Sequence, residues 1–386
     1  MIDRDQGTYA LAHVGRVLTP GASRVEPPCP LVERCGGCPW QHIDYTEQLL
    51  AKRQSVVDAL ERIAGIDNPP VEPVIASPDQ LDYRNRLKLR FDGRDIGFYS
   101  SRSHKLVPID DCIVAEPIVR EAIEPARALA ASLSTRVLRI EIASRGKLGG
   151  VMLALNGKGR LRRADVHRVR EMLAAPGHPV RGVVMWGKGW RRTWGDTRRR
   201  HSAAGRLSVE TTGTAFGQVN TGANHALVET VADAAALDGK QRVLDLYAGA
   251  GNFALALARD ARQIVAVESD RDAVEAARRS VEHHRLGNVM FFESRVETFL
   301  ESSDGPPMSR PDVVIVNPPR SGIGAATTLI ARIGARRIVY VSCDPTTLAR
   351  DLRAMLGEGY RLRKATPVDL FPHTFHVETV CDLVLT

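Results

Sequence analysis

The sequence predicts an α/β fold: a doubly wound, mostly parallel sheet in the second half of the chain, preceded by a separate mixed α/β module. From about residue 216 onward, short apolar runs typical of buried strands alternate with helical patterns and end in an antiparallel-type strand pair. This order builds a parallel sheet with helices on both faces. Between about residues 83 and 156, strand-like runs instead follow one another closely, and a helix is expected near 164–175. A chain of 386 residues is expected to form two or three domains.

Composition indicates a soluble globular protein, with 44% hydrophobic and 25% charged residues. No apolar run approaches the roughly 18 residues that a membrane span needs. The first residues lack a secretory signal pattern, so a cytoplasmic location is expected. The net charge of +8 suits a polyanionic partner. Nothing in the sequence indicates an obligate protein partner, and we expect a monomer.

Three parts are expected along the chain. Residues 1–28 carry little pattern and end in a proline-rich run, as a connector would. Residues 29–215 contain a cysteine cluster and the mixed module, and residues 216–386 form the doubly wound domain. An early helix is expected over 44–65, where apolar side chains recur at helical spacing before a glycine.

A cluster of cysteines near the start indicates a metal site. Cys29, Cys35 and Cys38 lie within ten residues in CPLVERCGGC, and in a cytosolic protein such spacing favours metal over disulfides. A fourth ligand is needed, and Cys112 is the remaining cysteine in the first half of the chain. Zinc and an iron–sulfur cluster both accept four thiolates, so the spacing leaves the metal open.

Tryptophan and basic residues alternate in WGKGWRRTWGDTRRR, residues 186–200. Aromatic surfaces for stacking and arginines for phosphate contacts are the combination that proteins of single-stranded RNA use. The alternative is a β-hairpin whose tryptophans are core residues and whose arginines are solvated. The sequence leaves both open.

The segment VLDLYAGAGNF predicts a cofactor site. A strand ends near Asp245 and leads into a turn with Gly249 and Gly251, while Glu268 ends the next strand and can accept both ribose hydroxyls. A nicotinamide dinucleotide is one possible ligand. However, a pyrophosphate clamp usually has a third glycine and lacks an acid at the strand end, so Asp245 favours S-adenosylmethionine, which has an amine and a sulfonium and no phosphate.

Asn317 follows the fourth strand of this domain in VIVNPPRSG. Its amide can offer both a donor and an acceptor to a planar base edge. Asn-Pro-Pro also occurs in methyltransferases that act on amines, which is an alternative reading. Those enzymes need no cysteine nucleophile.

Cys343 ends a predicted buried strand, Ile338–Ser342, at the sheet edge where ligands bind. Pro345 then turns the chain, and Thr346 or Thr347 is expected to cap a helix whose amino-terminus favours the thiolate. A buried, inert cysteine is the alternative. Glu378, in a buried-looking strand that enters the same edge, can serve as a base. A thiolate adding to C6 of uracil makes C5 nucleophilic toward a sulfonium methyl, and a base then removes the C5 proton.

Together these segments resemble the RNA uridine-5 methyltransferase family, which forms 5-methyluridine in ribosomal and transfer RNA. The resemblance runs from about residue 25 to the end of the chain. The matching segments are CPLVERCGGCPWQH, YRNRLKLR, IGFYSSRSH, DDC, FGQVN, LDLYAGAGNF, NPPRSG, VSCDPTTLARDL and FPHTFHVET.

The resemblance implies a class I methyltransferase domain with a seven-stranded sheet, S-adenosylmethionine as cofactor, Cys343 as nucleophile and Glu378 as the base. It further implies that the early helix packs on the catalytic domain. The S-adenosylmethionine site would be lined by Gln218, Tyr247, Glu268 and Asn317. The ligands of a [4Fe-4S] cluster in an RNA-binding central domain would be Cys29, Cys35, Cys38 and Cys112.

Two departures from the family pattern bear on the substrate. Many members have Asp where this chain has Asn317, and most begin with a small β-barrel domain, TRAM, of which residues 1–28 would be a remnant or linker. Either the chain is a short-form member or its true start lies upstream. Both features resemble a subset acting on 23S ribosomal RNA, so 23S rRNA is the expected substrate, and uridine-54 of transfer RNA is the alternative.

Two other functions fit parts of the sequence less well. An RNA cytosine-5 methyltransferase would carry a second cysteine in the segment that here reads NPPR. A non-catalytic RNA-binding protein would not need Cys343, Glu378 and the cofactor turn together.

Overall fold

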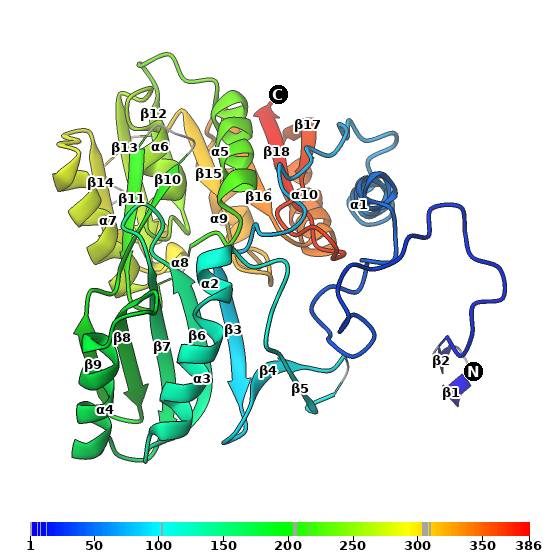
Figure 1. The fold of residues 1–386 in the computed structure, drawn as a ribbon. Helices are drawn as coiled ribbons and strands as arrows, with labels where there is room; N and C mark the ends of the chain where they lie inside the picture. The colour runs from blue at the N-terminus through cyan, green and yellow to red at the C-terminus, as the bar shows by residue number, and fades with distance from the viewer. Residues whose placement is uncertain are drawn as a thin grey trace.

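The computed structural model describes residues 2–5, 7, 9–12, 14–101, 103–203, 207–215, 217–302, 308 and 310–386 (Figure 1). Arg102 of the segment IGFYSSRSH and Phe216 of the segment FGQVN, where the second domain was expected to begin, lie outside the described residues. Within the described part, no helix combines the length and apolarity that crossing a membrane requires.

The second half of the chain forms a seven-stranded sheet in the order β14-β13-β12-β15-β16-β18-β17. Its first five strands are parallel, and β18 runs antiparallel between β16 and β17. This confirms the predicted doubly wound sheet with a final antiparallel pair. The strands are β12 (Arg242–Leu246), β13 (Gln263–Glu268), β14 (Val289–Glu293), β15 (Val313–Val316), β16 (Arg337–Ser342), β17 (Tyr360–Val368) and β18 (Glu378–Leu385).

Helices cover both faces of this sheet, as the near-continuous apolar strands require. One face packs against α5 (Thr221–Ala235), α6 (Asn252–Leu257) and α7 (Arg271–His283). The other packs against α8 (Val296–Leu300), α9 (Ala326–Arg332) and α10 (Pro345–Gly357).

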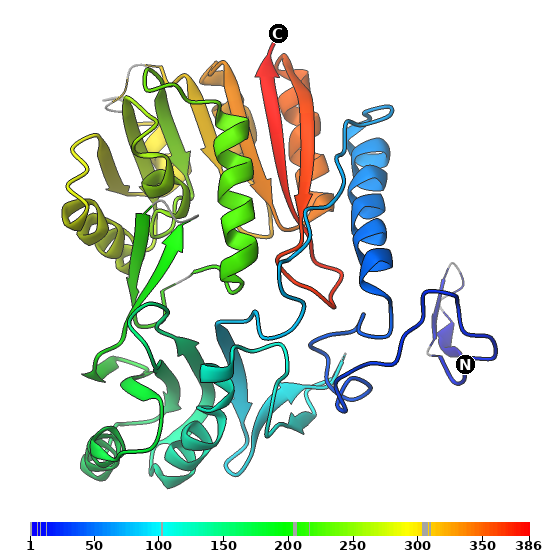
Figure 2. The ribbon, with the colours of Figure 1, turned by 45° about the horizontal axis from the view of Figure 1, so that its top comes forward.

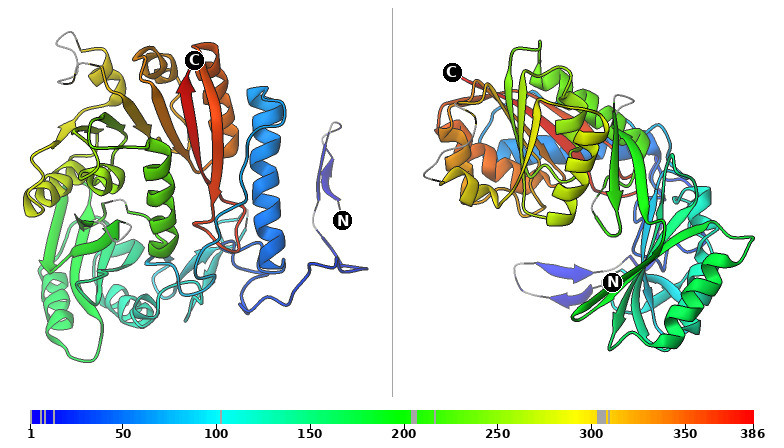
Figure 3. Two further views of the ribbon diagram at one scale, coloured as in Figure 1. Left: turned by 90° about the horizontal axis from the view of Figure 1, so that it is seen from above. Right: turned by 90° about the vertical axis from the view of Figure 1, so that its left-hand side faces the viewer.

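An amino-terminal helix completes the second face. It comprises α1 (Tyr45–Ala59) and a continuing π-helical turn, η1 (Leu60–Ala64), and ends at Gly65 in the left-handed conformation. Val56, Leu60 and Ala64 join the same core as α10. The helix stands beside α10 and β17, although about 300 residues separate these segments in sequence (Figures 2 and 3).

The first half of the chain forms a second seven-stranded sheet in the order β5-β4-β3-β6-β7-β8-β9. One face packs against α2 (Pro117–Arg120), α3 (Ile123–Ser132) and α4 (Arg163–Ala174). The strands are β3 (Arg86–Phe91), β4 (Ile96–Tyr99), β5 (Leu106–Pro108), β6 (Arg136–Ser144), β7 (Val151–Lys158), β8 (Val180–Gly187) and β9 (Trp190–Gly195).

Two antiparallel ribbons flank these sheets. β10 (Arg198–Ala203) and β11 (Leu207–Thr212) lead from the sheet of the first half, called the central sheet below, to the sheet of the second half. At the amino-terminus, β1 (Ile2–Asp5) pairs with β2 (Ala10–Ala12) and projects from the body of the molecule (Figure 3).

The tryptophan-rich segment is a β-hairpin of β8 and β9. Trp190 and Trp194 pack on the central core, and Arg191 and Arg192 are exposed, as the hairpin alternative predicted. That alternative was wrong for Arg199, which is 1% exposed and donates to the carbonyl of Ala215.

Candidate active site

Cys343 comes directly after β16 and two residues before the start of α10. The helix is capped by Asp344, whose Oδ1 accepts from the backbone N–H of Thr346 (3.0 Å) and of Thr347 (3.1 Å). The prediction that Thr346 or Thr347 caps the helix was therefore wrong. Pro345 fits the first helical position because it has no N–H to satisfy, which leaves Asp344 to cap.

Glu378 lies beside Cys343 because their strands are antiparallel neighbours. Ser342, the last residue of β16, stands opposite Thr379 of β18, so Cys343, one residue after Ser342, and Glu378, one residue before Thr379, meet at the same sheet edge. Glu378 is 6% exposed. The sheet thus brings together the two residues that the sequence predicted for catalysis.

The two groups influence each other's protonation. Burial raises the pKa of the Glu378 carboxyl to about 7, although the charge of Arg320 opposes this. Burial and then the negative charge of Glu378 raise the pKa of the Cys343 thiol above its usual value, while Arg320 lowers it through its charge and a hydrogen bond. The prediction that the helix amino-terminus makes Cys343 more acidic is not met, because burial and Glu378 outweigh it.

Arg320 is a site residue to which the sequence assigned no role. Its Nη2 lies 3.1 Å from Nδ1 and 3.0 Å from Nε2 of His376. Burial and the charge of Arg320 lower the pKa of His376 to about 4, so a neutral ring accepts from the guanidinium. Arg320 follows a recognisable Asn-Pro-Pro motif, but its partners, His376 in the loop before β18 and Cys343 after β16, lie on distant segments, and no local pattern connects them.

The predicted cofactor turn follows β12. Tyr247, Gly249 and Gly251 have φ angles of 60°, 56° and 92°, so the chain bends sharply between strand and helix. Glu268, at the end of β13, spans the turn: its Oε2 accepts from the N–H of Gly249 at 3.0 Å. Its Oε1 accepts from the N–H groups of Ser269 (2.6 Å) and Asp270 (2.7 Å), which fixes the carboxylate.

Asp245 lies fully buried beneath this turn. Its Oδ2 accepts from the N–H of Ala254 at 3.0 Å, while its Oδ1 has no hydrogen-bond partner among the described residues. Burial, with a smaller contribution from Glu268, raises its pKa to about 7. A buried carboxylate with an unpaired oxygen fits a ligand that brings a positive charge or a donor, as S-adenosylmethionine does.

The remaining predicted cofactor residues lie on separate segments. Tyr247 and Asn317 follow adjacent parallel strands, and the N–H of Asn317 donates to the carbonyl of Leu246 at 3.2 Å. Tyr247, Asn317 and Glu268 thus share one sheet edge. Gln218 lies in the segment before α5, where its carbonyl accepts from Asn85 Nδ2 at 2.9 Å.

The four predicted metal ligands are free, half-buried cysteines in two loops of the central module. Burial and then the charges of Cys35 and Cys29 raise the pKa of Cys38 to about 11; burial and then Cys38 raise that of Cys112 to about 12. The four thiols are therefore close enough to interact. Within the described ranges, no group of three or more His, Cys, Asp or Glu is arranged to hold a metal ion, and the four-cysteine ligand set stays a prediction.

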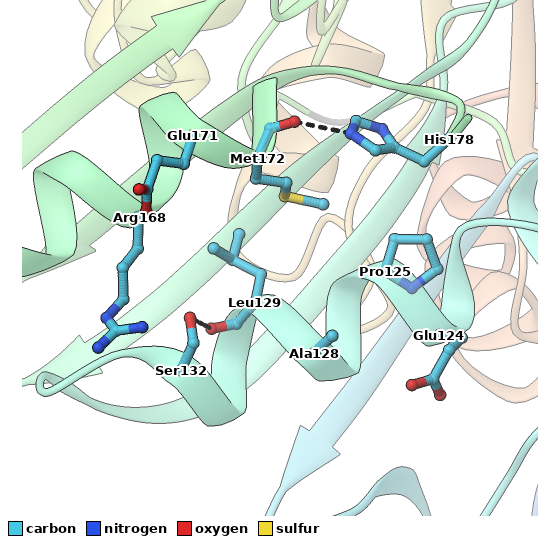
Figure 4. A pocket seen from close by; sticks show the side chains of 9 residues that line it. All are labelled: Glu124, Pro125, Ala128, Leu129, Ser132, Arg168, Glu171, Met172 and His178. Atoms are coloured by element: carbon cyan, nitrogen blue, oxygen red, sulfur yellow. Dashed lines mark hydrogen bonds between the residues drawn. The ribbon is translucent and has the colours of Figure 1, made fainter. Parts of the chain in front are cut away.

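A cavity of about 390 Å³ lies elsewhere, between α3 and α4 on the helical face of the central module (Figure 4). Apolar side chains such as Leu129 and Met172 line it, with Arg168 and Glu171 beside them. It contains none of the predicted site residues.

Comparisons with known proteins agree with this geometry. Residues 201–385 match the family described as tRNA (Uracil-5-)-methyltransferase. An uncharacterized RNA methyltransferase of Gloeobacter violaceus is 35% identical over 402 residues, which cover 97% of this chain and 86% of that protein. The 23S rRNA (uracil(1939)-C(5))-methyltransferase RlmD of Pectobacterium atrosepticum is 31% identical over 385 residues, which cover 98% and 84%.

Among solved structures, the tRNA (uracil-54, C5)-methyltransferase of Pyrococcus abyssi, in complex with S-adenosyl-L-homocysteine, superposes with a TM-score of 0.76 at 26% identity. The match covers 100% of this chain and 92% of that chain. The chain therefore belongs to the family of S-adenosylmethionine-dependent RNA (uracil-5-)-methyltransferases.

Proposed function

We propose that the enzyme methylates C5 of one uridine in RNA through a covalent bond between Cys343 and C6 of the base, with Glu378 as the base that removes the C5 proton. The observation that carries this proposal is that Cys343, which follows β16, and Glu378, which begins the antiparallel neighbour β18, lie at one sheet edge, with Arg320 acting on both.

The chemistry follows from these groups. Once deprotonated, Cys343 Sγ bonds to C6, and the ring electrons move toward the C4 oxygen, which makes C5 nucleophilic. C5 takes the methyl group, and Glu378 then accepts the C5 proton while the C6–S bond breaks and the thiolate leaves. The positive charge of Arg320 offsets the repulsion between the thiolate and the ionised Glu378.

S-adenosylmethionine supplies the electrophilic methyl group when bound. We propose that Gln218, Tyr247, Glu268 and Asn317 hold it. Support comes from the anchored Glu268 carboxylate and from the unpaired, buried oxygen of Asp245 under the same turn. A Cβ added at Gly249 would meet no atom within 4 Å, so the turn is open for a ligand to approach its backbone.

RNA would reach the site along the face of the central sheet that its helices leave uncovered. On that face β3 presents Lys88 and Arg90, whereas Arg86, in the same row, is 2% exposed and pairs with Glu141. Lys88 is 69% exposed, and the Arg90 guanidinium lies 4.9 Å from the ring centroid of Tyr99. Exposed cations beside an aromatic ring suit phosphate contacts and base stacking.

We propose 23S rRNA as the substrate, because the relative named for it is 31% identical across nearly the whole chain. Transfer RNA is the second candidate, favoured by the structural match at a TM-score of 0.76 to an enzyme named for uridine-54. Labelled methyl transfer to unmodified 23S and transfer RNA, followed by nuclease mapping, separates the two. Label at one 23S uridine supports our choice, and label in transfer RNA overturns it.

The covalent step has its own test. RNA containing 5-fluorouridine at the target cannot lose a C5 proton, so the Cys343 adduct should accumulate as a denaturation-resistant protein–RNA complex. We expect Cys343→Ala to form no complex and transfer no methyl group. The matched control is Cys381→Ala, in the same sheet but away from the edge, which should retain both. Normal methylation by Cys343→Ala would overturn the mechanism.

We further propose that Cys29, Cys35, Cys38 and Cys112 hold a [4Fe-4S] cluster. The support is chemical: four free thiols from two loops lie in mutual electrostatic range, and binding would require them to lose protons and turn toward one centre. The cluster would tie the residue 29–38 loop to the central sheet. Anaerobic purification should give iron and acid-labile sulfide in equal amounts, and Cys112→Ser should lose both. Zinc without sulfide would overturn the proposal.

A further inference from the structure

We propose that Asp351, a buried residue of α10 outside the reacting centre, is a positioning residue that holds the loop of Arg320 against α10 and so keeps Arg320 beside Cys343. This inference rests on the proposed role of Cys343 as nucleophile. The loop concerned, residues 318–323, follows Asn317 and is called the Arg320 loop below.

Asp351 is 2% exposed, and both oxygens of its carboxylate accept hydrogen bonds. Its Oδ2 accepts from the N–H of Ile323 at 2.7 Å and from the hydroxyl of Tyr340 at 2.8 Å. Its Oδ1 accepts from Nε (3.0 Å) and Nη2 (2.8 Å) of Arg350. One buried carboxylate therefore joins the Arg320 loop, the strand β16 and the helix α10.

Two further hydrogen bonds hold the Arg320 loop against α10; together with the contacts of Asp351 they form what is called the joint below. Arg350 Nη2 donates to the carbonyl of Ser321 at 2.8 Å, and Thr347 Oγ1 donates to the carbonyl of Arg320 at 3.2 Å. Gly322 has φ +76°, and a Cβ there would lie 2.4 Å from Arg350 Nη2 and 2.5 Å from Asp351 Oδ2. Loop and helix thus approach so closely that only glycine fits between them.

The joint connects two groups of the active site. α10 begins two residues after Cys343, and the Arg320 loop delivers the guanidinium that bonds His376 and the Cys343 side chain. Cys343 and Arg320 are therefore both positioned by the same helix, α10. The charged groups that act on Cys343 are Glu378 from β18 and Arg320 from this loop; Asp344, at the helix terminus, acts on His376.

If the joint opens, Arg320 moves away from Cys343 and the thiol loses the group that makes it more acidic. Glu378 stays in place, since its strand takes no part in the joint. The readout is the pH dependence of Cys343 alkylation by iodoacetamide in the full chain without substrate, followed on the Cys343 peptide by mass spectrometry. A general loss of stability would not change the alkylation midpoint, which is the pH at which the rate of Cys343 alkylation is half-maximal.

We expect Asp351→Asn to shift the alkylation midpoint to higher pH, toward that of Arg320→Gln. The double variant should shift no further than Arg320→Gln alone, because both changes remove one interaction. Asp351→Asn should also lower kcat about 10–100-fold while the KM for S-adenosylmethionine changes less than about threefold. Tyr340→Phe is the matched control: it removes a donor from the same oxygen without touching the loop, and should leave the midpoint unchanged.

If Asp351→Asn does not fold, Arg350→Gln, which releases only the Ser321 contact and the pairing with Asp351, serves instead and should shift the midpoint in the same direction. A wild-type midpoint in the folded variant, alongside a shifted Arg320→Gln, overturns the inference. That failure differs from failure of the proposed function, in which Cys343→Ala would still methylate RNA.

Discussion

Lys52 of α1 and Asp369, 317 residues later in the chain, form an ion pair of 2.6 Å whose two side chains are 0% exposed. The same lysine donates to the carbonyl of Phe371 at 3.1 Å, and Tyr45 donates its hydroxyl proton to Asp369 Oδ2 at 3.0 Å. One turn earlier in α1, Gln48 accepts from the N–H of His373 at 2.9 Å. The first helix therefore fixes the loop that leads into Glu378.

Removing one partner of this pair should be costly, because the other charge would remain buried. We expect Lys52→Ala to lower the free energy of unfolding by about 3–5 kcal/mol, measured by urea denaturation. Lys52→Met combined with Asp369→Leu should recover most of that loss, since it removes both charges. A Lys52→Ala variant within about 1 kcal/mol of wild type would contradict this account.

Activity should rise with pH, because both reacting groups act in their deprotonated forms. The pKa of Glu378 is raised to about 7, so below that value, where both groups are protonated, kcat/KM should fall about a hundredfold per pH unit. Above it, kcat/KM should still rise about tenfold per unit until the pH passes the pKa of Cys343, which lies above its usual value of 9.0. Initial rates of methyl transfer across this range test the prediction. A uniform tenfold rise per unit between about pH 5.5 and 8, with no change of slope near 7, would rule out Glu378 as the base.

Glu378 should destabilise the fold above neutral pH. Its pKa rises from 4.5 to about 7 on folding, so the folded state holds its proton more tightly and loses stability as pH rises through that interval. Glu378→Gln removes the buried charge and should raise the free energy of unfolding at about pH 8 by up to about 3 kcal/mol. Near about pH 4.5, where both forms are neutral in the folded state, the two proteins should be nearly equal. Equal gains at both pH values would refute this origin.

Gly249→Ala should weaken cofactor binding more than it weakens the fold. The residue has φ +56°, which costs alanine about 1–2 kcal/mol, and its added Cβ meets no protein atom but enters the open space at the turn. We expect at least about a tenfold rise in the Kd for S-adenosylmethionine by calorimetry. Gly251→Ala is the contrast, because its Cβ would lie 2.9 Å from Leu255 Cγ and Phe291 Cζ and should mainly reduce thermal stability.

The sequence predicted correctly those site residues whose positions depend only on where the strands begin and end. Strand patterns alone bring Asp245, Glu268 and Asn317 to one edge, and the antiparallel last strand brings Glu378 to Cys343. It could not predict Arg320 against His376, or Asp351 against the Arg320 loop, because these contacts depend on side-chain packing between segments with no shared periodicity. The expected acidity of Cys343 failed for a related reason: helix position is local, whereas burial and the charge of Glu378 arise from the tertiary fold.

The distance in sequence between α1 and its partners also determines when each part can fold during synthesis. Lys52 leaves the ribosome 317 residues before Asp369 does, an interval of roughly 15–60 s at ordinary elongation rates. Throughout that interval the lysine has no counter-ion, and the apolar side of α1 has no α10 to cover it. The helix α1 is thus made long before it can dock, and a stalled or shortened chain would expose it to chaperones and proteases.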